Sequence, residues 1–268
     1  MKAHLFTIEC LTNLHVGNGD ANYNIIDNEV ERDYVLNTPI IPSSGIKGAL
    51  REHFEAKWGK KDLRITEIFG SDFGQTSLGK TEPGTYKFFG AQLLVRPMRV
   101  SEGTVSFVQV TSLENINAFL NLLSGVGIEK LLGVQTAAKF SLDVQKNVIY
   151  TNNPDKSRAV EGIKTIEFPP EAKALEEFLD KLVGGDYAIV DKLSRYDLPV
   201  LARNQLDNGI SKNLWYEEIV PHKSLFAFVV LTPDENIELE FEINTAVQFG
   251  GNASIGCGYT RVTEVSCN

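Results

Sequence analysis

The sequence is poor in cysteine and has no long apolar run. Cys10, Cys257 and Cys267 are the three cysteines in 268 residues, and no two of them form a CxxC pair. An odd number of cysteines without that spacing argues against a disulfide framework and a structural zinc site, and it fits a reduced, cytoplasmic protein. No segment reaches the roughly 18 apolar residues of a membrane-spanning helix, and Met1 to Gly17 contains polar residues throughout. We therefore expect neither a membrane partner nor a signal peptide.

Basic residues are also in the minority. Lys and Arg number 26 against 35 Asp and Glu, which gives a net charge of −9. A nucleic-acid-binding domain is usually basic, so composition alone favours a protein that does not bind RNA. The charge is uneven, because six basic residues lie in the range 43–64 while Glu29, Glu31 and Asp33 form an acidic cluster. A basic groove on an acidic body therefore stays open as an alternative.

Hydrophobic periodicity predicts an α+β fold. Apolar residues at helical spacing predict helices over 43–58 and 113–123, and a third that begins at Pro169 and Pro170 and ends at Gly184. Strands are predicted over 2–11, 88–96, 104–111, 224–231, 237–243 and 259–265, and the Gly- and Ser-rich range 68–84 predicts a surface loop. This order favours one domain with a ferredoxin-like (RRM-like) core and long insertions. In such a core, helices would cover one face of an antiparallel sheet and leave the opposite face open for a ligand such as RNA.

A tight turn is predicted at Asp207, Asn208 and Gly209. The β-rich segments 199–206 and 210–215 flank it, and Asn-Gly supplies the positive φ angles that a two-residue hairpin needs. We expect an extended hairpin that carries apolar residues such as Leu201 and Leu206. A hairpin used for dimerisation would have the same sequence pattern.

The stretch from Leu14 to Arg51 organises the rest of the chain. Pro42 is followed by two serines, whose hydroxyl groups could accept hydrogen bonds from the first turn of the helix. Lys47 and Arg51 lie four residues apart and share a helix face. Together with the main-chain amides of Ser44 and Gly45, these two cations predict an anion site at the beginning of the helix.

Four residues outside that helix could take part in acid–base chemistry. His15 precedes a Gly-rich turn, and its imidazole could exchange a proton near neutral pH or simply pack at the end of a strand. Asp27 follows two apolar residues that would anchor a loop, although a solitary loop aspartate is most often a solvated turn residue. Glu217 and Glu218 are adjacent on a predicted strand, so at most one of them can face a given site.

Several segments, in order along the chain, carry a family resemblance. HVGNGD, IID with Arg32 a few residues later, IPSSGIKGALR, NLWYEEIVP and FGGNASIGCGYTRV resemble motifs of the RAMP proteins of type III CRISPR effector complexes. LWYEE followed by GGNASIGCG is most similar to the repeated backbone subunit of the type III-B (Cmr) complex, with the type III-A (Csm) counterpart as the near alternative. The resemblance extends from the first strand to the C-terminus.

The resemblance implies a single RAMP domain over 1–268, with a catalytic loop over 14–42 and a thumb hairpin inserted over 198–216. It implies a crRNA-binding subunit that cuts bound target RNA at regular intervals in antiviral defence. Asp27 would coordinate a divalent metal ion, Mg²⁺ or Mn²⁺, and the other catalytic candidates are His15, Glu217 and Glu218. The partners would be crRNA, target single-stranded RNA, copies of the chain stacked head to tail and other subunits of the complex. The residues expected to contact RNA are Ser43, Ser44, Gly45, Lys47, Arg51, Arg203, Gly250, Gly251, Asn252, Gly256 and Gly258.

Other functions stay open. A non-catalytic scaffold of the same fold would use Asp27 only as a turn residue. A metal-independent endonuclease that processes guide RNA would use His15 as its base. An acidic cytoplasmic enzyme acting on small molecules would fit the charge, but the sequence has no Walker or dinucleotide-binding motif.

Overall fold

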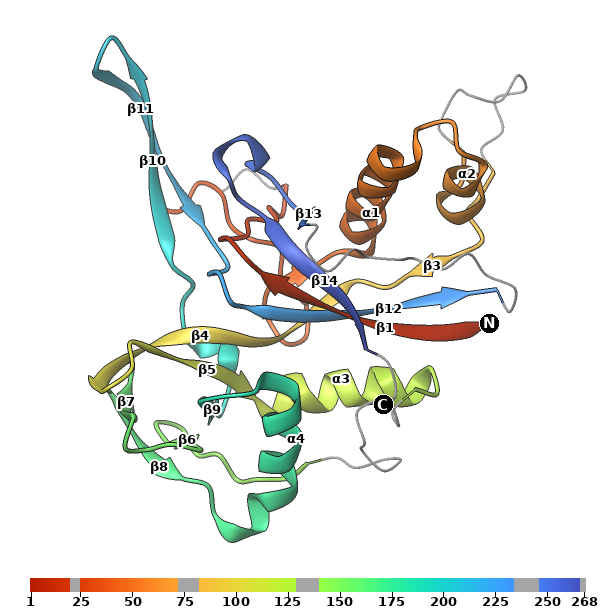
Figure 1. Ribbon diagram of the computed structural model, residues 1–268. Helices are drawn as coiled ribbons and strands as arrows, with labels where there is room; N and C mark the ends of the chain where they lie inside the picture. The colour runs from red at the N-terminus through yellow and green to blue at the C-terminus, as the bar shows by residue number, and fades with distance from the viewer. Residues whose placement is uncertain (20–24, 72–81, 129–139, 234–245, 266–268) are drawn as a thin grey trace.

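The computed structural model describes residues 1–19, 25–71, 82–128, 140–233 and 246–265 (Figure 1). The α-helices in these ranges are α1 (Ser43–Trp58), α2 (Leu63–Phe69), α3 (Leu113–Gly125) and α4 (Lys173–Val183). The 3₁₀ helices are η2 (Pro170–Ala172), η3 (Leu193–Arg195) and η4 (Ala253–Ile255). The strands are β1 (Lys2–Cys10), β2 (Ile40–Ile41), β3 (Lys87–Phe88), β4 (Ala91–Gly103), β5 (Phe107–Ser112), β6 (Ile149–Thr151), β7 (Ser157–Val160), β8 (Ile163–Glu167), β9 (Tyr187–Val190), β10 (Val200–Asp207), β11 (Ile210–Glu218), β12 (Leu225–Thr232), β13 (Val247–Gln248) and β14 (Tyr259–Val265).

The centre of the main sheet is antiparallel. Its strands lie in the order β14-β1-β12-β4, and each pairs with its neighbour in the antiparallel sense. Because β1 and β4 both run opposite to β12, they run parallel to each other with β12 between them. Helix α1 lies between β1 and β4 in the chain, so these elements form a split β-α-β unit.

Both faces of this sheet are buried. In β12, Phe226, Phe228 and Val230 join the hydrophobic cluster that contains the inner side of α1. The alternate residues Ala227 and Val229 join a second cluster with α3. Figure 1 shows α1 and α3 on opposite sides of β1 and β12. The expected open sheet face is therefore wrong, because a strand with apolar residues in both alternating sets must be covered on both sides.

The sheet continues beyond β4 into a second part of the molecule. The order β4-β5-β9-β6-β8-β7 returns to β4, because β7 pairs with the end of β4 at Val100–Gly103. Helix α4 covers this part, and its Leu175, Phe178 and Leu179 pack with Ile116 of α3 in a third hydrophobic cluster. In the sequence, the segment from β5 to β9 lies between β4 and the hairpin of β10 and β11.

The predicted helices agree well with the observed ones. Helix α1 has the predicted bounds, with Ile46, Leu50 and Phe54 buried, and α3 and α4 occupy the predicted ranges. The predicted serine cap of α1 is wrong, since Pro42 is the N-cap residue and makes no side-chain hydrogen bond. Helix α2 is absent from the prediction and includes the start of the expected loop at 68–84. The strand predicted over 237–243 lies outside the described residues.

Strands β10 and β11 form a separate two-stranded sheet. They form no ladder with the main sheet among the described strands, although Asn28 makes an isolated parallel bridge to Glu217, and they project from the body of the molecule in Figure 1. Asn208 and Gly209 at the turn have φ angles of 49° and 80°, which confirms the predicted hairpin chemistry. Leu206, Ile210 and Leu214 near the turn are exposed.

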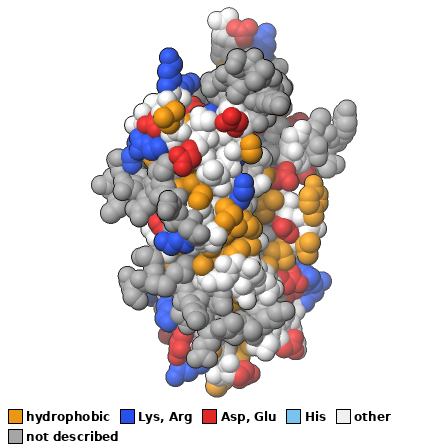
Figure 2. Space-filling model, turned by 90° about the vertical axis from the view of Figure 1, so that its right-hand side faces the viewer, with side chains coloured by type: hydrophobic (Ala, Val, Ile, Leu, Met, Phe, Trp, Pro, Cys, Tyr) orange, Lys and Arg blue, Asp and Glu red, His pale blue; other side chains and the backbone are white. Residues whose placement is uncertain are grey.

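The face of the molecule drawn in Figure 2 has no single dominant character. Figure 2 shows hydrophobic side chains gathered near the middle of the face at the right of Figure 1, with acidic and basic side chains interspersed around them. Among the described helices, none is both long and apolar enough to cross a membrane.

Candidate functional site

Strand β11 holds two of the predicted catalytic residues along one edge. The Oδ2 atom of Asp27 accepts a hydrogen bond from the main-chain N–H of Tyr216 at 2.8 Å, and the N–H of Asp27 donates to the Tyr216 carbonyl at 3.1 Å. Two residues further along, the Glu218 carbonyl accepts from Nδ1 of His15 at 2.7 Å. Alternate residues of a strand direct their main-chain groups to the same edge, so Asp27 and His15 are anchored roughly 7 Å apart along β11.

The bond to Glu218 sets the protonation pattern of the His15 ring. A carbonyl oxygen only accepts hydrogen bonds, so Nδ1 carries the proton and Nε2 is left as an acceptor. The side chain is 8% exposed. Gly17 lies against it, because a Cβ atom at position 17 would come within 3.1 Å of Nε2. A side chain at position 17 would therefore crowd Nε2, and an unprotonated ring nitrogen of this kind can take a proton from a substrate hydroxyl.

Asp27 combines exposure with a fixed orientation. Its residue is exposed, while the bond from Tyr216 and the neighbouring main-chain bonds hold its loop against β11. The second carboxylate oxygen, Oδ1, accepts no hydrogen bond from the described residues. One oxygen thus positions the side chain, and the other is available to a ligand.

Glu217 is the centre of a buried hydrogen-bond network. Its Oε1 accepts from Nε1 of Trp215 at 2.8 Å and from Nδ2 of Asn28 at 3.5 Å. Its Oε2 accepts from Nδ2 of Asn252 at 2.9 Å and from Nε of Arg203 at 3.1 Å. These donors come from β11, the loop before α1, the C-terminal loop and β10. Glu217 therefore joins the hairpin to two loops that are distant in sequence.

The electrostatics of Glu217 do not favour the predicted acid–base role. Burial by itself would raise the pKa of its carboxyl group, but the hydrogen bonds from Trp215 and Arg203 and the positive charge of Arg203 outweigh burial. The pKa of Glu217 therefore lies below its ordinary value. A carboxylate that is held ionised with both oxygens occupied is poorly suited to exchange a proton.

Glu218 is committed to a different set of partners. Its side chain accepts from Nη2 of Arg32 and, at 3.1 Å, from the main-chain N–H of Val30. Its own N–H donates to the Asn28 carbonyl at 2.9 Å. The two adjacent glutamates thus diverge, as neighbours on a strand must, and neither presents a free carboxylate beside Asp27.

The glycines of the C-terminal loop pack against the protein itself. Gly250 has a φ of 74°, and a Cβ atom there would collide with the His15 carbonyl oxygen, which accepts from the N–H of Gly251 at 2.8 Å. A Cβ atom at Gly258 would collide with the carbonyl oxygen of Phe249. Gly250 and Gly251 therefore support His15 directly. Gly256, with nothing within 4 Å of an added Cβ, is the loop glycine with space beside it.

The predicted anion site on α1 is only partly available. Ser43, Ser44 and Gly45 are exposed in the first turn, and Lys47 is half-buried. Arg51 donates from Nε to Glu55 at 2.7 Å and from Nη1 to the Gly70 carbonyl at 3.1 Å. Because these bonds fasten Arg51 to α1 and to the end of α2, they do not favour its predicted phosphate contact.

A comparison with models of protein families identifies the family of the chain. A model of the RAMP superfamily matches residues 7–261. The chain belongs to the RAMP superfamily.

Two curated relatives of this RAMP chain are CRISPR proteins. It is 26% identical to the CRISPR system Cmr endoribonuclease Cmr4 of Pyrococcus furiosus, in an alignment that covers 100% of this chain and 98% of that protein. It is 27% identical to the CRISPR system CMR subunit Cmr4 of Saccharolobus solfataricus, with 67% of this chain and 57% of that protein covered.

Solved structures share the RAMP fold over the whole chain. A chain of type III-B Cmr-beta bound to cognate target RNA, solved by cryo-EM, has a TM-score of 0.71 at 20% identity and covers 99% of this chain and 98% of its own length. The crystal structure of oligomeric Cmr4 from Pyrococcus furiosus has a TM-score of 0.66 at 19% identity, with 100% and 99% covered. At these identities the similarity establishes the fold alone.

The described part of this RAMP chain contains no preformed metal cage. No three His, Cys, Asp or Glu side chains of the described ranges converge as ligands. Mg²⁺ commonly takes only one or two protein carboxylates and completes its shell with substrate phosphate and water. The free Oδ1 of Asp27 fits an ion that RNA and protein hold together.

No site role was predicted for three residues whose side chains bind Glu217 or Glu218: Asn28, Arg32 and Trp215. Trp215 could have been found, because residues two apart on a strand share a face and Trp215 precedes Glu217 by two. Arg32 and Glu218 are 186 residues apart in the sequence, so no local sequence pattern could predict their ion pair.

Proposed function

We propose that this chain is the repeated crRNA-binding backbone subunit of a type III-B CRISPR ribonucleoprotein, and that it cuts bound target RNA at regular intervals as a metal-dependent endoribonuclease. The observation that supports cleavage is the exposed Asp27 carboxylate, oriented on the same strand edge that fixes the tautomer of His15. The name of the Pyrococcus furiosus relative, an endoribonuclease, agrees with this reading.

The proposed reaction is attack of a ribose 2′-oxygen on the adjacent phosphorus. A P–O bond forms to the 2′-oxygen, the bond to the 5′-oxygen breaks, and the products are a 2′,3′-cyclic phosphate and a 5′-hydroxyl group. Nε2 of His15 takes the 2′-hydroxyl proton, and water protonates the leaving oxygen. A divalent ion, Mg²⁺ or Mn²⁺, would be held by Asp27 and would supply stabilisation of the negative charge at the phosphate.

Glu217 and Glu218 take positioning roles in this proposal. Glu217 holds the hairpin to the loops of Asn28 and Asn252, and Glu218 holds the Arg32 segment and, through its carbonyl, the His15 ring. Their own protons take no part in the reaction.

The domain plan that we propose is one RAMP domain over 1–268 with a ferredoxin-like core. The order β14-β1-β12-β4 and the split β-α-β unit support that core. Within it, 14–42 is the catalytic loop and 198–216 is the thumb. The exposed Leu206 and Ile210 would enter the guide–target duplex and displace a base pair.

Guide RNA would bind mainly through its backbone. The exposed first turn of α1, with Lys47, offers main-chain amides to phosphate, and Gly256 leaves space for close approach. Copies stacked head to tail along one crRNA, with other subunits of the complex, would repeat the Asp27 site at a regular spacing. We place this assembly in the cytoplasm.

The test is cleavage of guide-complementary RNA by the reconstituted complex with Mg²⁺. Asp27→Asn keeps an oxygen for the Tyr216 N–H but removes the charge, and Asp27→Ala removes both. We expect both variants to lose regularly spaced products by about 100-fold or more while assembly and target binding persist. Asp155→Asn, at an exposed carboxylate on the turn before β7, is the matched control and should cut normally.

Other outcomes identify the rival functions. Cleavage that survives both Asp27 variants would disprove the nuclease assignment to Asp27 and leave either a scaffold or chemistry at His15 or at the pair Glu217 and Glu218. RNA binding without metal-dependent cutting would indicate the non-catalytic scaffold. Cleavage of repeat RNA that resists EDTA would indicate a metal-independent processing enzyme. Assembly with type III-A rather than type III-B subunits would indicate the Csm counterpart.

A further inference from the structure

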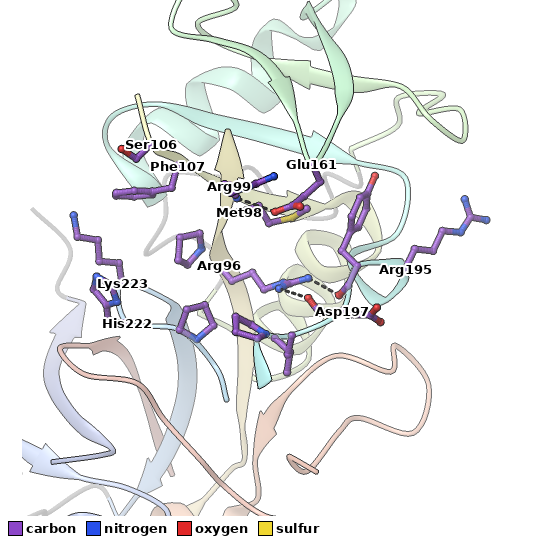
Figure 3. Close-up of a pocket in the computed structure, with 15 residues that line it drawn as sticks. Arg96, Met98, Arg99, Ser106, Phe107, Glu161, Arg195, Asp197, His222 and Lys223 are labelled. Atoms are coloured by element: carbon purple, nitrogen blue, oxygen red, sulfur yellow. Dashed lines mark hydrogen bonds between the residues drawn. The ribbon is translucent and has the colours of Figure 1, made fainter. Parts of the chain in front are cut away.

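The molecule contains a cavity of about 600 Å³ (Figure 3). Its walls are the hairpin of β4 and β5, the segment 195–199 before β10, and the turn 221–223 after β11. None of the residues proposed above for cleavage or RNA binding lines it. The volume is in the range of small-ligand sites in proteins.

A buried arginine forms the floor of this cavity. Arg96 is 3% exposed and donates from Nη1 to the Asp197 carbonyl at 3.1 Å and from Nη2 to the Tyr196 carbonyl. Burial lowers the pKa of Arg96 to about 10, with the neighbouring Arg32 adding to the effect. The guanidinium stays charged at neutral pH, and Figure 3 shows it between Lys223 and Asp197.

The rim of the cavity is cationic and exposed. Arg99, Arg195 and Lys223 line the opening with His222, so together with Arg96 the cavity has four permanent cations and two carboxylates, those of Glu161 and Asp197. The chain as a whole carries a charge of −9, which makes this local surplus of positive charge notable. Arg195 pairs with Asp191, whereas the Arg99 guanidinium has no ion-pair partner among the described residues.

An exposed aromatic ring completes the cavity. Phe107 is 37% exposed, and Nζ of Lys223 lies 4.5 Å from its ring centre. Figure 3 places Phe107, His222 and Lys223 on one side of the cavity and Arg195 on the other. A flat apolar surface therefore lies within the same opening as the cations, which is the combination that binds a base and its phosphate.

We propose that this cavity is a second site, which binds one nucleotide. The base stacks on Phe107, its amino groups donate to Glu161 or Asp197, and the phosphate contacts Lys223 or Arg99. An acidic peptide fits less well, because Glu161 and Asp197 would repel it. The nucleotide comes either from the free pool or from a single-stranded RNA, since the chemistry recognised is the same.

The experiment measures binding to the full-length chain by titration calorimetry, with ATP as the free nucleotide and a single-stranded RNA of about six nucleotides as the polymer. Phe107→Leu removes the stacking ring but keeps an apolar side chain, and Lys223→Gln removes one rim charge. We expect each to weaken binding about tenfold. Lys181→Gln, at an exposed lysine of α4, is the control and should have no effect.

ATP and the single-stranded RNA distinguish a free nucleotide from a nucleotide of an RNA chain as the ligand. Phe107-dependent binding of ATP supports a free-nucleotide site, and Phe107-dependent binding of the RNA alone supports an RNA site. If neither probe binds, or if both bind equally well to Phe107→Leu, Lys223→Gln and Lys181→Gln, the proposal is overturned. Loss of an acidic subunit of the complex from Lys223→Gln, with ligand binding unchanged, also overturns it.

This inference stands apart from the cleavage function. The same Phe107→Leu chain, assembled into the complex, should still cut target RNA at the Asp27 site. Failure of the nucleotide site would therefore leave the nuclease proposal intact, and Asp27→Asn should leave ATP binding unchanged.

Discussion

The single carboxylate of Glu217 connects four segments, and each of its partners is a hydrogen-bond donor. Glu217→Gln replaces one acceptor oxygen with an NH₂ group that faces donors. We expect the free energy of unfolding to fall by about 1–3 kcal/mol, because buried donors lose their partner. Urea unfolding of the full chain checks this, with Glu177→Gln on the exposed side of α4 as the control. Equal stability of the two variants would contradict the role of Glu217 as a hub.

Glu217 also makes the stability of the folded protein depend on pH, in a direction that follows from its lowered pKa. The pKa of Glu217 is lower in the folded protein than its ordinary value of about 4.3. Its contribution to stability is therefore complete above the ordinary pKa and is lost as pH falls through the lower, folded pKa. Unfolding measured between about pH 6 and pH 3 should show a steeper loss of stability for the native chain than for Glu217→Gln. Parallel curves would contradict the lowered pKa.

The turn of the β10–β11 hairpin has two successive residues with positive φ angles. Asn208 and Gly209 both adopt positive φ angles, and β10 and β11 form no ladder with the main sheet among the described strands. Replacing both turn residues by Ala should cost about 1 kcal/mol at each position, because Ala rarely adopts this conformation. Since the hairpin projects from the body, this cost should open the hairpin and leave the core intact.

Hydrogen exchange can show whether the hairpin opens while the core stays folded. Amide protection in β10 and β11 should fall in the double variant, while protection in β12 stays unchanged. Lys212→Ala, on the exposed part of the same hairpin, is the control. A matching loss of protection in β12 would mean that the hairpin and the core unfold as one unit, contrary to this prediction.

The whole molecule is acidic, so its affinity for RNA must come from a few local cations. Acidic and basic side chains are interspersed on the face in Figure 2, without a continuous basic surface among its described residues. We expect the isolated chain to bind single-stranded RNA weakly and with strong salt dependence, and the assembled complex to bind much more tightly. In titrations between about 50 and 200 mM salt, a plot of the logarithm of affinity against the logarithm of salt concentration should have a slope of about −0.7 per neutralised phosphate.

Single substitutions locate those cations. Lys47→Gln should reduce the salt slope by about 0.7, whereas Lys181→Gln should leave it unchanged. Tight binding by the isolated chain that does not respond to salt would show that electrostatics is not the source of affinity. An unchanged slope for Lys47→Gln would remove the first turn of α1 from the RNA site.

Elements with local sequence signals were predictable from the sequence. The apolar stripes of α1, α3 and α4 and the Asn-Gly turn act within a few residues, so each was predicted close to its observed bounds. The short helix α2 escaped prediction, because seven residues give little periodicity. Motifs in a fixed order were also enough to indicate the family.

Tertiary structure alone decided which side chains meet. The cover on both faces of the sheet, the engagement of Arg51 with Glu55 and the Gly70 carbonyl, and the partners of Glu217 depend on residues far apart in the chain. The cavity of Arg96 is likewise assembled from segments around positions 96, 107, 161, 196 and 222. Burial and hydrogen bonding are properties of the packed chain, and a residue type by itself specifies neither its neighbours nor its charge state.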